Sequence, residues 1–472
     1  MIQYDLSGTS TRAQTEAHGL THKKLLPSHK MLAASLLLVM LLTAACQPVP
    51  RDPGSRVREA AQGFVDQVGS DPSSCARDFR VIEPNLTRTP QQMDFNAGYY
   101  QGIMQNTGDV SFVVKGQFPN SILLSWVIYD ANGQIYSAVN DQELTPDVGN
   151  VNPFLPGVDV LAANRSYTAF FMPEGAVAPE GIAASNVLTL PPVSTSDRIY
   201  ITMRSYWSQP GYPRVGGPTP TIQAVSAADP TQPATCPGLG LDEDLFPLAP
   251  FTIPTPESGR ILFFRPPNHI IPMADGTKTA EPNGCTGYGM AQLSDTDLNV
   301  IKLHKVPVFP DNQNLTESSV WSNDFEVRYV GLEANGASLL GPRSDIAMND
   351  LKQQADGSAL LVTIPRPSDL SAKERLALLE KARANNWNIM PSAGEGAQVA
   401  PFLTYRNKLA DASFPYSITA IPCFGSDLGE WSEATIDYAS SPENMGEYYI
   451  DGVICTIDEV LDDSCVQQLA NE

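Results

Sequence analysis

Histidine, the usual general base of a hydrolase, is scarce in this sequence of 472 residues. Past residue 45 only His269 and His304 remain, and neither belongs to an H-E-x-x-H zinc motif. No G-x-S-x-G nucleophile elbow is present either. His304 stands in Lys302-Leu-His-Lys305, which alternates like a strand, so a surface histidine is favoured over a catalytic one. The lack of these motifs therefore argues against a catalytic role.

One short segment is rich in the oxygen ligands that Ca²⁺ prefers. It contains Asp141, Asp147, Asn150 and Asn152, within a loop that also holds proline and glycine. The same residue types dominate turns, where their oxygens accept hydrogen bonds from backbone amides. The turn interpretation is favoured, and calcium is kept as the alternative. No other cofactor is indicated.

Aromatic side chains offer a second kind of binding site, because sugars stack on exposed rings. Tyr206, Trp207 and Tyr212 stand in or beside a segment rich in proline and glycine and are the candidates for such a surface. Trp126 lies in an apolar run and is expected in the core.

Two carboxylates suggest a catalytic alternative. Asp130 and Glu333 occupy matching places in the two halves and could carry out glycoside hydrolysis if the fold paired them. The recurring arginines are expected to bind carboxylates on neighbouring strands. They are Arg165, Arg204, Arg328 and Arg406.

Six cysteines follow Cys46, and no C-x-x-C is present. An even number in an exported protein favours disulfides over metal or redox chemistry. Six cysteines permit 15 connectivities. The preferred set is Cys75 with Cys236, Cys285 with Cys423, and Cys455 with Cys465, all six being paired.

The first 45 residues have the pattern of an export signal. Lys23, Lys24 and Lys30 precede an apolar run from Met31 to Thr43, which is too short to span a bilayer and ends in Ala-Ala-Cys46. This ending resembles the lipobox of bacterial lipoproteins, with Thr43 in place of the usual leucine. The resemblance implies a lipid on Cys46 and an outer-membrane location. Ordinary secretory cleavage, which would leave a free thiol, is the alternative.

Composition limits the partners. The formal net charge of −22 argues against nucleic acid, which requires clustered basic residues. From residue 426 to the end there are twelve acidic residues and no Lys or Arg, and a solvated acidic extension is the simplest interpretation.

The pattern of elements predicts a mainly β protein of two tandem β-sandwich, jelly-roll-like domains with few helices. Short β-rich runs alternate with Pro, Gly and Asn clusters, and 40 prolines leave little room for long helices. One helix is expected over Ser371–Asn386, with a Ser371/Glu374 capping box and an apolar stripe of Leu376, Leu379 and Ala382. The expected divisions are signal peptide 1–45, tether and short helix 46–74, first sandwich 75–235, linker 236–256, second sandwich 257–425 and acidic extension 426–472.

The halves share short motifs. Asp130-Ala-Asn-Gly133 parallels Glu333-Ala-Asn-Gly336, and Thr202-Met-Arg204 parallels Thr404-Tyr-Arg406. A diverged duplication and chance similarity between β domains both explain them.

Further motifs give the chain a family resemblance. They include WVIYDANG, D-x-x-x-x-x-D-x-G-x-x-NPF, Asn386-Trp387-x-x-Met390-Pro391 and Phe402-x-x-Tyr405-Arg406. Over residues 94–410 the sequence resembles exported bacterial proteins of unknown function with tandem jelly-roll domains. These exported proteins are in turn similar to larger domain-of-unknown-function families whose sequences end in an N-W-x-P and R-x-Y signature. The resemblance implies a fold and a compartment but no activity.

The sequence therefore favours a non-catalytic envelope protein that binds a ligand, such as a glycan, or assembles with itself. The alternative is a secreted polysaccharide hydrolase that uses carboxylates paired by the fold.

Overall fold

The computed structural model describes the two β-rich halves of the chain with gaps. The described residues are 75–82, 96–131, 135–194, 197–208, 215–236, 259–263, 271–272, 278–279, 287–309, 326–336, 342–347, 350–365, 367–392, 401–409 and 438–470. The leader, Cys46, the helix expected over 57–68, and the predicted pair Cys285–Cys423 lie outside them.

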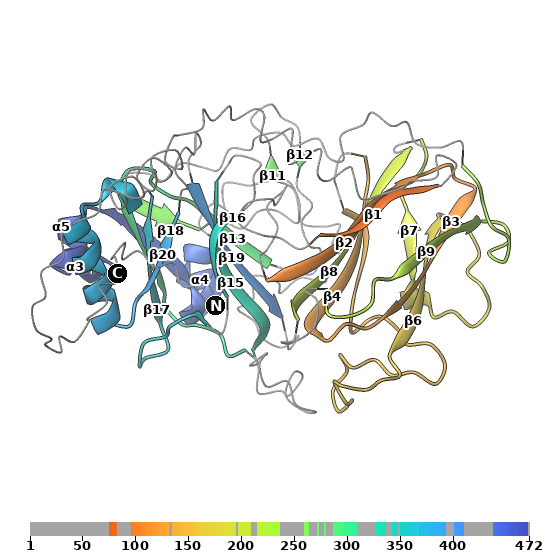
Figure 1. Cartoon of the computed structure of the whole chain (residues 1–472), viewed down its shortest axis with the longest axis horizontal. Coiled ribbons are helices and arrows are strands. Elements are labelled where there is room, and N and C mark those ends of the chain that lie inside the picture. The colour runs from red at the N-terminus through yellow and green to blue at the C-terminus, as the bar shows by residue number, and fades with distance from the viewer. Residues whose placement is uncertain are drawn as a thin grey trace, which may run out of the picture. The chain divides into compact units, whose positions relative to one another are not determined.

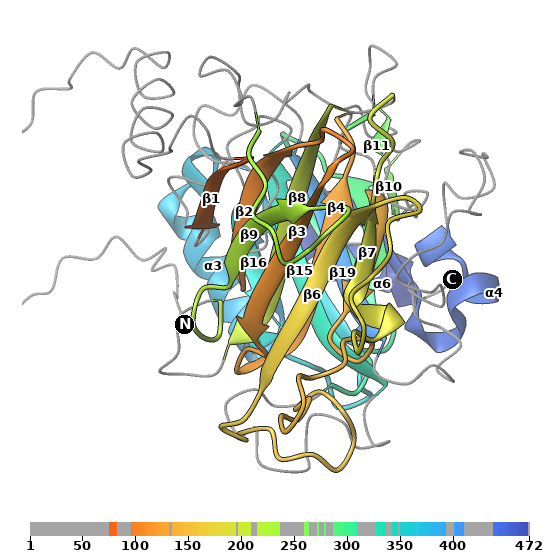
Figure 2. The ribbon, with the colours of Figure 1, turned by 90° about the vertical axis from the view of Figure 1, so that its right-hand side faces the viewer.

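The first half consists of two β-sheets (Figures 1 and 2). One sheet has the order β1-β2-β8-β4-β5, formed by Ala76–Ile82, Ala97–Gln105, Arg198–Ser208, Ser121–Tyr129 and Ile135–Asn140. The other has the order β7-β6-β3-β9, formed by Val187–Leu190, Ser166–Pro173, Val110–Gln117 and Thr221–Ser226. Apolar residues of both sheets are buried between them, and Trp126 is in this core as predicted, donating to the Tyr167 hydroxyl at 2.9 Å.

The second half also has two larger sheets. One has the order β13-β19-β15-β16, formed by Gly287–Gln292, Pro401–Leu409, Val327–Gly336 and Pro342–Ala347. The other has the order β10-β20-β14-β17-β18, formed by Arg260–Leu262, Ile450–Cys455, Leu298–Leu303, Ala359–Ile364 and Asn388–Pro391. A two-stranded sheet joins β11 (Ile271–Pro272) and β12 (Lys278–Thr279). The protein is thus mainly β, with sandwich architecture and few helices, as predicted.

The two halves repeat one strand order. The series β2-β8-β4-β5 matches β13-β19-β15-β16, and β7-β6-β3-β9 matches β18-β17-β14-β20. Even the parallel pairs correspond, β6 with β7 and β17 with β18. The Thr-x-Arg motifs lie on the equivalent strands β8 and β19. This is the arrangement that a duplication predicts.

Residues 438–470 are not a separate extension, so the expectation for 426–472 is wrong for this described part. Strand β20 lies between β10 and β14, inside a sheet of the second half. Within residues 438–470, Ile450, Val453, Val460 and Leu469 are buried, while the acidic residues other than Asp451 are partly or fully exposed. The segment folds because its apolar residues, rather than its charges, face the protein.

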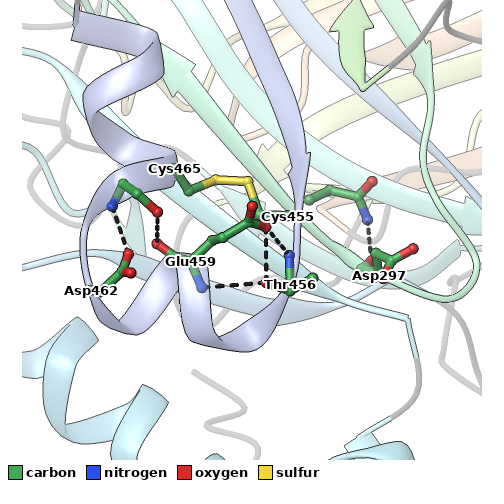
Figure 3. The surroundings of a disulfide bond; sticks show 8 residues. Asp297, Cys455, Thr456, Glu459, Asp462 and Cys465 are labelled. Atoms are coloured by element: carbon green, nitrogen blue, oxygen red, sulfur yellow. Dashed lines mark hydrogen bonds between the residues drawn. A yellow bond between two sulfur atoms is a disulfide. The ribbon is translucent and has the colours of Figure 1, made fainter.

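Short helices follow β20, namely α5 (Ile457–Leu461) and α6 (Ser464–Ala470), with α4 (Pro442–Met445) before it. Thr456 and Glu459 form a capping box at the start of α5, and the Ser464 amide donates to Asp462 at 2.9 Å (Figure 3). The predicted disulfide Cys455–Cys465 ties α6 to the end of β20. The predicted disulfide Cys75–Cys236 joins the two ends of the first half, with its Cα atoms 4.8 Å apart.

The predicted long helix is α3, Ala372–Ala384, and its Ser371/Glu374 capping box is present. Its predicted stripe is partly wrong. Leu378 and Ala382 are buried, whereas Leu376 is 56% exposed. The buried side chains are four residues apart and therefore lie on one helix face, which is rotated away from Leu376. Within the described residues no helix is long and apolar enough to cross a bilayer.

Candidate functional site

The loop between β5 and β6, which contains the predicted calcium ligands, begins with a buried carboxylate. Asp141 accepts a hydrogen bond from the Leu124 amide at 2.7 Å, and its other oxygen lies 2.7 Å from a guanidinium nitrogen of Arg328 in β15. Both side chains of this ion pair are fully buried. Desolvation lowers the pKa of Arg328, and the charge of Asp141 opposes that shift. Asp141 thus binds a protein cation that comes from the other half of the chain.

The other predicted ligands hold the same loop together. The Asn152 amide group donates to the carbonyls of Asp141 and Leu144, at 2.6 and 2.8 Å, while its oxygen accepts from the Phe154 amide. Asn150 accepts from the Ser166 amide at 3.0 Å. The side-chain oxygens of Asn150 and Asn152 cap backbone amides, as the turn interpretation predicts. In the part of the chain that the structure describes, no three His, Cys, Asp or Glu residues lie close enough to hold a metal ion.

A second loop, between β6 and β7, is fixed to the first. Thr145 and Asn186 exchange two hydrogen bonds, from the Thr145 amide to Asn186 at 2.7 Å and from Asn186 to the Thr145 carbonyl at 2.8 Å. Asn186 also donates to the Thr168 carbonyl in β6. These bonds fix the last residues of the β6–β7 loop to the β5–β6 loop. The β6–β7 loop starts elsewhere, because it leaves β6 at Pro173 whereas the β5–β6 loop enters β6 at Ser166, the opposite end of the strand.

The β5–β6 loop exposes large apolar side chains. Val148 is 102% exposed, and Leu155 and Leu161 are also exposed. The backbone below Val148 is fixed, because Asn164 donates to the Gly149 carbonyl and accepts from the Val151 amide, both at 2.8 Å. Gly149 itself has a φ of +80°, a conformation that favours glycine. Single exposed apolar residues are ordinary, but three on one loop that is fixed by hydrogen bonds form a candidate interaction surface.

The same loop carries exposed carboxylates, Glu143 and Asp159. Its basic residue, Arg165, is buried, and it donates to the carbonyls of Ala162, Phe118 and Val160 and to the side chain of Asn120. Arg165 therefore stabilises the loop from inside. We call the exposed residues of the β5–β6 loop the loop surface; they include Glu143, Val148, Leu155, Asp159 and Leu161.

The predicted aromatic surface is not supported for Tyr206. This residue is buried, and its ring centroid lies 5.2 Å from that of Tyr329 in the second half. Tyr206 therefore packs between the halves and is not a platform for a ligand. The side chain of Trp207, and Tyr212 altogether, lie outside the described residues.

The recurring arginines do not share one role. Arg328 has a carboxylate partner, as predicted. Arg204 donates to the Tyr129 hydroxyl at 2.6 Å and lies 5.7 Å from the ring centroids of Tyr99 and Tyr129. Buried tyrosines are thus among its contacts. The side chain of Arg406 is outside the described part.

His304 is not the surface residue that its strand pattern suggested. Its side chain is 14% exposed, and one ring nitrogen lies 2.9 Å from a carboxylate oxygen of Asp451. The imidazole stacks on Tyr449, with the two centroids 3.6 Å apart. Sequence reasoning missed this contact because Asp451 lies 147 residues away, in the segment interpreted as a solvated extension. The contact joins the end of β14 to the start of β20, so it has a structural explanation.

Comparisons with known proteins supply no function. No family model matches the chain, and no curated protein matches it. An uncharacterised protein from Burkholderia cenocepacia has 11% sequence identity and a TM-score of 0.42, over 78% of this chain and 87% of that one. The VPA0106 protein from Vibrio parahaemolyticus has 11% identity and a TM-score of 0.34, over 68% of this chain and 87% of that one. Likenesses this weak carry no functional argument.

Proposed function

We propose that this chain is a non-catalytic binding protein of the bacterial cell envelope, which binds a partner through the loop surface. The observation that carries the proposal is the exposure of Val148, Leu155 and Leu161 on a loop fixed by side-chain hydrogen bonds. Exposed apolar side chains cost free energy in water unless a partner covers them. A preformed loop also loses little conformational entropy on binding, so it suits recognition.

The compartment in this proposal rests on the sequence and the cysteines. The leader pattern places the mature protein outside the cytoplasm, with a lipid on Cys46 and an outer-membrane location. Two disulfides, Cys75–Cys236 and Cys455–Cys465, support an oxidising compartment, where such bonds persist. A tether of about 30 residues between Cys46 and the first strand would leave the sandwiches free to meet a partner near the membrane.

The contacts of the residues that were weighed for catalysis support binding rather than turnover. His304 is held by Asp451 and Tyr449. Asp130 is half-buried after β4, while Glu333 is buried within β15. An acid and a base for hydrolysis must instead face a common substrate.

A selection experiment tests the proposal. The purified mature protein is used to select from a random peptide display library and is incubated with a glycan panel, with both retention and product release recorded. We expect retained peptides without product release, and loss of retention in the variant Val148→Ser/Leu161→Ser. The matched control is Leu376→Ser/Val308→Ser, which removes two exposed apolar side chains from the second half. Turnover abolished by one Asp or Glu substitution, or retention that both variants lose equally, would overturn the proposal.

A further inference from the structure

We infer that the partner of the loop surface is an uncharged, apolar polypeptide segment, which binds at the end of the first sandwich opposite to the membrane anchor. This inference rests on the proposed function and adds the chemistry of the partner and the side from which it approaches. Three observations carry it, namely the position of the loop in the sandwich, the composition of its outer part and the hydrogen bonds of its backbone.

The loop surface and the tether lie at opposite ends of the first sandwich. The carbonyl of Cys75, which follows the tether, accepts a hydrogen bond from the amide of Gln105 at the end of β2. The loop begins at Asp141, whose amide donates to the carbonyl of Leu124 near the start of β4. Strands β2 and β4 both pair antiparallel with β8 and therefore run in the same direction, so these two contacts lie at opposite ends of the sheet. Because β2 has nine residues, the two ends are about 30 Å apart.

This position favours a partner outside the anchoring bilayer. A lipid on Cys46 would attach the membrane through the tether, which enters the sandwich at Cys75. For the loop surface to reach that bilayer, the tether would have to extend back along the whole sandwich. A flexible chain extends in this way only by losing conformational entropy. The loop surface is therefore available to a partner that approaches from the other side.

The outer part of the loop is almost free of charge. Residues 148–164, which we call the loop tip, contain one charged residue, Asp159, although 17% of the residues of the whole chain are charged. The Asp159 carboxylate accepts the Leu161 amide at 2.8 Å, so it has a role within the loop. Acidic residues precede the tip, and Lys115, which pairs with β6 beside the loop, has the opposite charge. The charges around the tip are thus of both signs and select neither a cationic nor an anionic partner.

The backbone of the tip is hydrogen-bonded within the loop. The amides of Val151, Leu155, Val158 and Ala162 donate to carbonyls of the loop, and those of Phe154 and Leu161 donate to the side chains of Asn152 and Asp159. These donors are engaged and do not serve a partner, whereas the side chains of Val148, Leu155 and Leu161 are exposed. Contacts with the tip are therefore mainly apolar.

Other occupants fit less well. A glycan is held in place by hydrogen bonds to its polar groups, and the amides of the tip are engaged within the loop. A second copy of this chain carries the same net charge of −22 and would be repelled at long range. An uncharged apolar polypeptide segment covers Val148, Leu155 and Leu161 and brings no charge of its own to the tip.

Three synthetic peptides of equal length test the chemistry of the partner. The first alternates leucine and serine, the second replaces leucine by glutamine, and the third replaces serine by lysine. Binding to the purified mature protein is followed by fluorescence anisotropy at low and at high salt. We expect the Leu/Ser peptide to bind at least about tenfold more tightly than the Gln/Ser peptide, because the latter lacks apolar side chains. The affinity of the Leu/Ser peptide should change by less than about twofold with salt, which screens charged contacts, and the Lys/Leu peptide should bind no more tightly at high salt.

The variant Val148→Ser/Leu161→Ser assigns the binding to the loop tip. It should bind the Leu/Ser peptide at least about tenfold more weakly than the unchanged protein. The matched control, Leu376→Ser/Val308→Ser, should bind it within about twofold of the unchanged protein. Neither variant changes the net charge, and far-UV circular dichroism verifies that each folds.

The anchored protein tests the direction of approach. The mature lipoprotein is incorporated into phosphatidylcholine vesicles, and the same chain without the lipid, beginning at residue 47, is measured in solution. Vesicles that carry the Val148→Ser/Leu161→Ser variant correct for binding of the peptide to lipid. We expect the two affinities for the Leu/Ser peptide to agree within about twofold, because the tip faces away from the bilayer.

Several results would overturn the inference while leaving the proposed function intact. An affinity that is tenfold weaker on vesicles would mean that the bilayer covers the tip. A library that yields only charged, salt-dependent peptides requiring Val148 and Leu161 would mean that charge selects the partner. A dimer in sedimentation velocity that Val148→Ser/Leu161→Ser abolishes would make a second copy the occupant.

Failure of the proposed function would be seen separately, in a library selection that yields no peptide dependent on Val148 and Leu161. A mature protein that does not incorporate into vesicles would lack the anchor, and the direction of approach inferred from it would then be wrong as well.

Discussion

The buried ion pair between Arg328 and Asp141 is the feature of this protein whose energetics can be predicted most directly. It joins residues 187 positions apart, from β15 of the second half to the loop after β5 in the first. Arg328→Met removes the cation and leaves the carboxylate buried, with the Leu124 amide as a hydrogen-bond donor. Breaking a buried pair from one side costs about 3 to 5 kcal/mol, because an uncompensated charge stays out of water.

The partner substitution should cost a similar amount. Asp141→Asn keeps an oxygen for the Leu124 amide but removes the negative charge that faces the buried Arg328, so about 3 to 5 kcal/mol of stability should again be lost. In the double variant Arg328→Met/Asp141→Asn both charges are gone, and the cost is a buried amide group that lacks a partner, about 1 to 3 kcal/mol. The double variant should therefore be no less stable than either single variant.

Urea unfolding, followed by tryptophan fluorescence and by circular dichroism, measures these differences. Coincidence of the two probes shows whether one transition describes both halves. Lys115→Met, which removes an exposed cation from β3, is the matched control and should change stability by less than about 0.5 kcal/mol. Two results would contradict this reasoning. One is a loss of unfolding free energy in the double variant that equals the sum of the losses in the two single variants, and the other is a loss of less than about 1 kcal/mol for Arg328→Met.

Three further predictions concern anchoring, disulfides and alkaline pH. Cys46→Ala should abolish partitioning with membranes in a cell fraction, and unchanged processing and partitioning would contradict the lipid anchor. Thiol counting on the denatured, unreduced mature protein should give zero free thiols, and two or more would contradict full pairing. Burial raises the pKa of Tyr100 and of Tyr448 to about 12 each, so the folded state retains protons that the unfolded chain releases near 10. Stability should fall as the pH rises from 10 towards 12, and in that range Tyr100 and Tyr448 should add to the tyrosinate absorbance only on unfolding. Full ionisation of these tyrosines near pH 10 in the folded state would refute the burial argument.

Local patterns predicted those features that neighbouring residues determine. The apolar run around Trp126 predicted a core strand, and Ser371 with Glu374 predicted the start of α3, because both depend on residues within a few positions. Two disulfides of the preferred set, one of 15 possible connectivities, are also present.

Other features depend on strand pairing between distant segments, which one sequence does not display. The segment from residue 426 reads as a solvated extension because it has twelve acidic residues and no basic one. The short apolar alternation around Val453 forms a strand because its backbone pairs with β10 on one side and with β14 on the other. That insertion also places Asp451 beside His304, so both errors have the same cause.

The loop that contains Asp141, Asn150 and Asn152 shows how a contact with a distant strand decides between two interpretations of a segment. Asp141, Asn150 and Asn152 are equally suited to calcium and to a network of turns, and nothing within the loop decides between them. The deciding group is the guanidinium of Arg328, which takes the place at Asp141 that a cation would otherwise occupy. This contact ties the rigidity of the loop to the second half. The Arg328→Met variant should therefore weaken peptide binding at Val148 even though Arg328 lies on another strand. Unchanged affinity in a folded Arg328→Met variant would show that the loop holds its conformation by the asparagine network alone.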